Sequence, residues 1–140
     1  MASRERSSSP IPTIDELMTP FPYAIEIDRR AGDAERMLAG RAIRHLPVTN
    51  GGEIYSVLSA RELELALARP GADPWQLGVR ELCARDPYIV DISEPADVVL
   101  DQMAARHIGC AVIAKDDRVA GIFTTVDACR WLAARLRGEH

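Results

Sequence analysis

The chain has 140 residues, of which 47% are hydrophobic and 27% charged, and its formal net charge is −4. This length suits one domain that buries roughly two thirds of its unfolded surface. The negative net charge argues against a nucleic-acid partner, since such binding favours clustered positive charge. No apolar run approaches the ~20 residues of a membrane-spanning helix, so we expect a soluble protein without membrane contact.

The N-terminal segment 1–11 is rich in serine and proline and has no apolar stretch. We expect a disordered tail there rather than a secretory signal. The three cysteines, Cys83, Cys110 and Cys129, have neither a disulfide-framework nor a metal-ligand spacing. They predict reduced thiols in a cytoplasmic protein with no metal site.

An internal repeat organises the chain. When the numbering is shifted by 65, residues 14–68 align with residues 79–133 without a gap. Identical pairs include Glu16/Glu81, Leu17/Leu82, Pro22/Pro87, Tyr23/Tyr88, Ile27/Ile92, Arg41/Arg106 and Ile43/Ile108. Such a repeat indicates two copies of one structural unit. We expect a pseudo-two-fold pair, with any binding site at or near the seam between the copies.

Hydrophobic spacing predicts the same elements in both copies: a strand, a helix, a β-hairpin around a polar turn, and a closing helix. In the first copy the predicted ranges are 23–27, 31–42, 46–48 with 54–58, and 60–68. In the second copy they are 88–92, 96–107, 110–114 with 119–123, and 125–137. Each unit is therefore β-α-β-β-α, and the fold class is α/β (α+β).

A proline- and glycine-rich segment separates the copies. It runs from Pro70 to Pro74, and the residues from Trp75 to Leu82 predict a short lead-in helix capped by Asp73. The expected organisation is a tail over 1–11, repeats over 12–69 and 79–137, and a linker over 70–78.

Several motifs, taken in order, resemble the CBS domain. In the first copy they are Glu16-Leu-Met-Thr-Pro-x-Pro22, Ile43-Arg-His-Leu-Pro-Val48 and Ser59-x-Arg-Glu-Leu63. In the second they are Ile108-Gly-Cys-Ala-Val112 and Gly121-Ile-Phe-Thr-Thr-Val-Asp127. The resemblance covers roughly residues 12–137. Two such repeats form the compact pair known as a Bateman module.

The resemblance implies a regulatory binding module rather than an enzyme. Its ligand would be an adenosine-containing effector such as AMP, ADP, ATP or S-adenosylmethionine, and no cofactor would be required. The module would act in trans on a protein that the sequence does not identify, and would associate as a homodimer. The residues agree on chemistry, since no Ser/His/Asp order, Walker loop or metal signature is present. The alternative is a ligand-free scaffold that acts through protein–protein contacts.

The resemblance also implies a ligand site at the start of the second closing helix. Thr124 and Asp127 would contact the ribose and phosphate region, next to Ile122. The rest of the cleft would come from Thr19, Pro22 and Ile43, at the opening and middle of the other repeat. Thr124-x-x-Asp127 is also close to a helix capping box, so we expect these residues both to contact the ligand and to cap the helix; the alternative is a cap alone.

The two copies differ at the corresponding polar positions. Ser59-x-x-Glu62 is a still better capping box, so we expect a cap alone there and a weaker or empty site. By the resemblance, Arg44 and His45 would face ligand phosphates. Their counterparts are Gly109 and Cys110, which favours a ligand with few phosphates or with a neutral or positive tail. Alternatively, Arg44 is a solvated strand-edge residue and His45 packs under the sheet.

Overall fold

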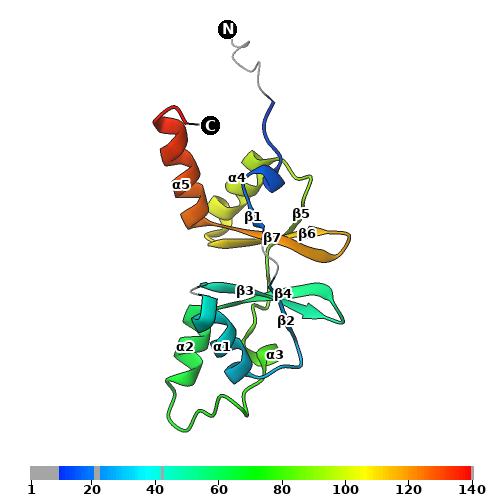
Figure 1. Ribbon diagram of the computed structural model, residues 1–140, viewed down its shortest axis with the longest axis vertical. Helices are drawn as coiled ribbons and strands as arrows, with labels where there is room; N and C mark the ends of the chain where they lie inside the picture. Colours follow the sequence, from blue (N-terminus) through cyan, green and yellow to red (C-terminus); the bar gives the residue numbers. More distant parts are fainter. Residues whose placement is uncertain (1–9, 21–22, 42, 140) are drawn as a thin grey trace.

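The computed structural model describes residues 10–20, 23–41 and 43–139. Two β-sheets lie at the middle of the molecule, and the helices cover their outer faces (Figure 1). One sheet has the order β2-β3-β4 and the other the order β1-β7-β6-β5. Each sheet is covered by the crossover and closing helices of one repeat, α1 with α2 or α4 with α5, so the α+β fold expected from the sequence is confirmed.

The described elements follow one plan twice. The first half contains a short 3-10 helix, four strands and two helices: η2 (Ile14–Glu16), β1 (Thr19–Pro20), β2 (Ile25–Glu26), α1 (Ala31–Arg41), β3 (His45–Asn50), β4 (Glu53–Ser59) and α2 (Ala60–Leu67). The second half contains α3 (Val79–Leu82), β5 (Ile89–Asp91), α4 (Ala96–Arg106), β6 (Cys110–Lys115), β7 (Arg118–Thr124) and α5 (Thr125–Leu136). No helix of the described residues is long and apolar enough to cross a membrane.

Within each repeat the strand pairing is the same. β2 runs parallel to β3 and β5 runs parallel to β6, with α1 and α4 as the crossovers. β3–β4 and β6–β7 are antiparallel hairpins. The first hairpin turn uses Gly51 and Gly52 at positive φ, whereas Asp116 and Asp117 adopt that conformation in the second. Aspartate tolerates the left-handed region better than most residues, so both sequences form the turn.

The lead-in segments exchange partners between the repeats. Ile14 of η2 is fully buried in the core of the second repeat, and Val79 of α3 is fully buried in the core of the first. The backbone bonds match as well. The Ile14 amide donates to the Glu94 carbonyl at 2.7 Å, and the Val79 amide donates to the Arg29 carbonyl at 2.9 Å. Neither repeat therefore completes its core with its own lead-in segment.

The predicted lead-in helix over 75–82 is wrong in its first half. α3 begins only at Val79, because Gly78 before it has extended backbone (φ −96°, ψ 150°). Trp75 lies in a turn, and the Trp75 amide donates to the Asp73 carboxylate at 2.9 Å. The Trp75 ring packs against Gly32 of α1, where an added Cβ would lie 2.6 Å from it. One helical turn does form after Asp73, since the Leu77 amide donates to the Asp73 carbonyl at 3.1 Å, but the extended Gly78 keeps it from continuing into α3.

One glycine allows the strand from the first half to join the second sheet. β1 pairs antiparallel with β7, with Thr19 opposite Ile122. A Cβ on Gly121 would lie 2.5 Å from the Thr19 carbonyl oxygen and 2.7 Å from Met18 Sδ. The counterpart of Gly121 is Ser56, whose buried hydroxyl donates to the Ala84 carbonyl at 2.6 Å. The same approach of two segments is thus accommodated by a missing side chain in one repeat and by a hydrogen bond in the other.

Replacing Gly121 by alanine should destabilise the protein by about 1–3 kcal/mol, since the new methyl group overlaps backbone that cannot rotate away. Chemical denaturation would measure this change. Gly40→Ala is the matched control, because a Cβ there meets nothing within 4 Å and the residue lies in α1. We expect Gly40→Ala to be neutral or stabilising. Equal stabilities of the two variants would contradict the packing argument.

Candidate functional site

Thr124 and Asp127 form a complete capping box at the start of α5. The Asp127 amide donates to Thr124 Oγ1 at 3.2 Å, and the Thr124 amide donates to Asp127 Oδ2 at 2.9 Å. The Thr124 hydroxyl also donates to Oδ2, at 3.1 Å. The cap expected from the sequence is thus confirmed, and it holds the carboxylate at the end of β7 in a fixed orientation.

The exchanged strand β1 brings Thr19 to the same place. Because Thr19 lies opposite Ile122, its hydroxyl reaches Asp127 Oδ1, to which it donates at 3.4 Å. Both carboxylate oxygens of Asp127 therefore accept hydrogen bonds from the protein. The bond to Oδ1 is long and exposed to solvent. Four predicted site residues, Thr19, Ile122, Thr124 and Asp127, are brought together. Pro22 lies outside the described residues.

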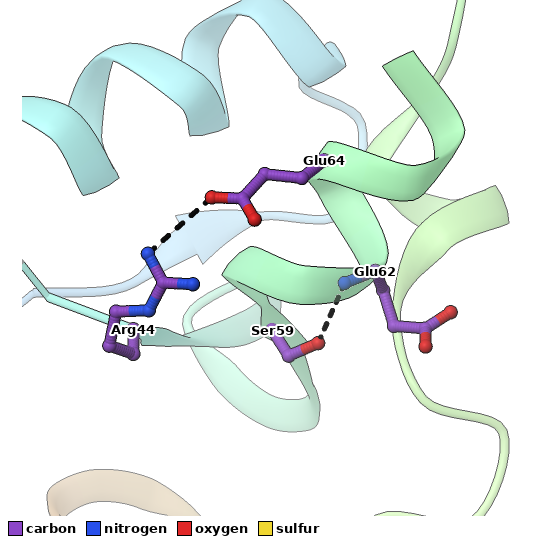
Figure 2. A network of polar contacts seen from close by, with 4 residues as sticks. All are labelled: Arg44, Ser59, Glu62 and Glu64. Atoms are coloured by element: carbon purple, nitrogen blue, oxygen red, sulfur yellow. Dashed lines mark hydrogen bonds and ion pairs between the residues drawn. The ribbon is translucent and has the colours of Figure 1, made fainter. Parts of the chain in front are cut away.

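Arg44 pairs with an acid of α2 rather than with this group. Its guanidinium Nη1 is 3.4 Å from Glu64 Oε2 on α2 (Figure 2). Arg44 and Ile43 line a hollow of about 680 Å³ between α1 and α2. Its other lining residues belong to these two helices or directly follow α2, so this hollow does not coincide with the Asp127 group. The structure therefore separates Ile43 and Arg44 from the Asp127 group.

His45 is half-buried at the start of β3, opposite Ser59. Burial lowers the pKa of His45 below its usual value, and the positive charge of Arg44 acts in the same direction, while Asp127 opposes both. His45 is therefore neutral at pH 7 and supplies no positive charge to the cleft. Burial also raises the pKa of its counterpart Cys110 to about 12, so that thiol stays protonated.

A hollow of about 190 Å³ lies between the repeats, and its lining matches the predicted site after the shift of 65. Six predicted site residues have their counterparts in this lining. For Ile122, Thr124, Asp127, Pro22, Ile43 and Arg44, the counterparts are, in the same order, Val57, Ser59, Glu62, Pro87, Ile108 and Gly109. The remaining lining residues are His45, Leu82, Ala84, Asp86, Tyr88 and Cys110. The sequence analysis did not propose this set as a site, although the repeat shift could have found it.

The prediction that Ser59 and Glu62 form the better capping box is wrong. Ser59 Oγ accepts from the Glu62 amide at 3.1 Å, but the reciprocal bond is missing. The longer Glu62 side chain extends away from Ser59 (Figure 2). Its exposed carboxylate has no side-chain partner among the described residues, and it lines the 190 Å³ hollow. Among the described residues, the Glu62 carboxylate therefore has no partner, whereas the Asp127 carboxylate accepts the cap bonds.

A tyrosine with an arginine over its ring occurs at the same place in both repeats. The Arg41 guanidinium lies 4.1 Å from the Tyr23 ring centre, and that of Arg106 lies 5.0 Å from the Tyr88 ring centre. Arg106 also pairs with Asp86, at 3.3 Å. Within the described residues no group of histidine, cysteine and carboxylate side chains could hold a metal ion.

The depressed pKa of His45 predicts a pH-dependent stability. Above the unfolded-state pKa of about 6.5 the neutral ring costs nothing, and below it protonation favours the unfolded chain. Stability should therefore fall as the pH drops from about 7 through the lower folded-state pKa. Urea denaturation between pH 8 and 5 should show a shallower fall for His45→Gln. The same slope for both proteins would contradict this account.

Comparisons with known proteins agree with this architecture. The chain resembles the CBS domain pair of protein MJ0100, crystallised with 5′-methylthioadenosine and S-adenosyl-L-methionine, at 23% identity and a TM-score of 0.78 over 90% of this chain and 99% of that chain. It resembles a candidate acetoin utilization protein (AcuB) from Vibrio cholerae at 21% identity and a TM-score of 0.74, over 93% and 99%. It resembles the hexameric CBS-CP12 protein of bloom-forming cyanobacteria at 20% identity and a TM-score of 0.75, over 86% and 71%.

These likenesses concern the fold. A comparison with curated protein sequences gives no match. The CBS domain family profile matches residues 14–69 and 79–134, which together make up most of the chain. The resemblance seen in the sequence is therefore confirmed, and the protein belongs to the CBS domain family as a tandem pair of repeats.

Proposed function

We propose that this chain is a regulatory module that binds an adenosine-containing small molecule between its repeats and acts on a separate protein. The observation that best supports this proposal is the hollow at Glu62, because its lining contains the repeat counterparts of the predicted site residues. The complex of the MJ0100 pair with 5′-methylthioadenosine and S-adenosyl-L-methionine supports this class of ligand.

The lining supplies the groups that a nucleoside needs. Val57, Ile108 and Pro87 offer apolar surface for a flat base, next to the Tyr88 ring. Strand ends offer backbone groups to read the edge of the base, and a carboxylate can accept hydrogen bonds from ribose hydroxyls. In the first repeat Glu62 stands at the matching position, and its carboxylate has no partner among the described side chains.

The pseudo-symmetric site at Asp127 is the second binding position of the proposal. Thr124 and Asp127 would meet the ribose, with Thr19, Pro22 and Ile122 around the base. A ribose hydroxyl would replace the long 3.4 Å bond from Thr19 and leave the cap bonds in place. Ile43 and Arg44 would join this site only if the Arg44 guanidinium left Glu64. His45 lines the hollow between the two repeats.

The ligand-free scaffold remains the second candidate, and exposed apolar surface favours it. None of the residues of α5, all of which are described, is buried. Val126, Leu132 and Leu136 are more than half exposed on this helix. Uncovered apolar side chains on one helix are typical of a contact surface. The hexameric CBS-CP12 relative supports association between copies, and we propose a homodimer.

Binding at the second position is testable through Asp127. Asp127→Asn removes the charge but keeps the size, and should weaken adenosine-nucleotide binding there about tenfold, the cost of losing a charge-assisted hydrogen bond. Thermal unfolding and calorimetry with AMP, ADP, ATP and S-adenosylmethionine would measure it. Asp101→Asn, an exposed acid of α4, is the control. Unchanged affinity would remove Asp127 from the site. If no ligand stabilised the wild-type protein, the scaffold would become the better explanation.

The proposed dimer is testable through Leu132, the counterpart of Leu67 in the helix-side hollow. Leu132→Glu should raise the dimer dissociation constant at least tenfold, because a charge would be buried against apolar surface. Analytical ultracentrifugation would measure it. Leu65→Glu is a matched control, since Leu65 is 53% and Leu132 55% exposed, and Leu65 lines a different hollow, beside the linker. Equal effects of the two changes would contradict a contact at α5.

A further inference from the structure

The hollow at Glu62 is too small to enclose a whole nucleotide. Its volume is about 190 Å³, below the ~300 Å³ at which small-molecule pockets usually begin. A ligand seated there would therefore project out of it. The direction of that projection decides which side chains meet the substituent of the nucleoside.

A second hollow adjoins the first at Glu62. It has a volume of about 500 Å³ and lies between α2 and the linker. Glu62 and Leu82 line both hollows, so a substituent leaving the cleft on this side passes the Glu62 carboxylate. The outer hollow offers Leu65, Ala66 and Leu77 as apolar surface.

The charges along this path are mostly negative. The inner hollow is the one of about 190 Å³ at Glu62. Among its described lining residues, Glu62 and Asp86 are charged at neutral pH, and Asp86 pairs with Arg106 at 3.3 Å. His45 adds no charge, because burial lowers its pKa.

In the outer hollow Asp73 and Glu81 already accept backbone amides, at 2.9 and 2.8 Å, and Arg69 is the one described basic residue of the lining. Glu62 is thus the acid on this path with a free carboxylate.

We propose that the Glu62 hollow takes a nucleoside bearing a cationic substituent, such as a sulfonium or ammonium group, and disfavours phosphate. This inference rests on the proposed function and assigns a ligand class to one of its two positions. Glu62, whose side chain extends away from Ser59 and lines both hollows, would face this substituent as its counter-ion rather than the ribose hydroxyls. A phosphate leaving the cleft on this side would meet this carboxylate without a facing cation from the inner lining.

Three probes of graded charge test the inference by titration calorimetry in the Asp127→Asn background, which weakens the other position. They are S-adenosylmethionine (cationic), 5′-methylthioadenosine (neutral) and AMP (anionic). With Glu62 present, affinity should fall in that order. Glu62→Gln should reduce the preference for S-adenosylmethionine over 5′-methylthioadenosine about tenfold and should strengthen AMP binding.

Asp101→Asn is the control, because it removes one negative charge from an exposed position of α4 that lines neither hollow. It should leave the order of the three probes unchanged. AMP binding more tightly than S-adenosylmethionine, or a preference unaltered by Glu62→Gln, would overturn the charge assignment while the proposed function stands. No binding of any probe to the wild-type protein would overturn both.

Discussion

The reciprocal exchange of the two lead-in segments is the constraint on which the rest of the molecule depends. Ile14 fills the core of the second repeat and Val79 fills that of the first. Two further backbone bonds repeat this symmetry. The Ala96 amide donates to the Pro12 carbonyl and the Ala31 amide to the Leu77 carbonyl, both at 2.8 Å. Removing either segment would open a fully buried position, so the two repeats form one cooperative unit.

The same exchange builds both candidate positions. After η2 the chain lies along β7 and then crosses back to β2, and after α3 it lies along β4 and then crosses to β5. Each crossing segment is thereby held against the start of a closing helix. Thr19 meets Asp127 in one repeat, and Ala84 donates to the Val57 carbonyl at 2.9 Å near Glu62 in the other. A nucleoside position between the repeats needs no further scaffold than this arrangement.

The two positions have the same backbone and different chemistry. Aspartate is short enough to fold back on the Thr124 amide, so Asp127 is held by its own helix. Glutamate at the matching position does not close the box, so the Glu62 carboxylate has no partner among the described side chains. A difference of one methylene group therefore decides which of the two acids caps its own helix with its carboxylate. The resemblance to other CBS pairs is a likeness of fold and leaves these roles to the individual side chains.

The sequence by itself determined the repeat, the order of the elements and the family. These depend on local spacing, since apolar residues at period two or 3.6 and glycine or aspartate turns carry their signal within one segment. Only the tertiary structure decided into which core each lead-in segment packs, that the turn at Trp75 ends before α3, and that Arg44 faces Glu64. It also decided that, among the described residues, the Glu62 carboxylate has no partner while that of Asp127 has. These features depend on contacts between residues far apart in the chain, or on which of two nearby groups a side chain binds. Local patterns cannot distinguish such alternatives, because the packing of the whole molecule selects between them.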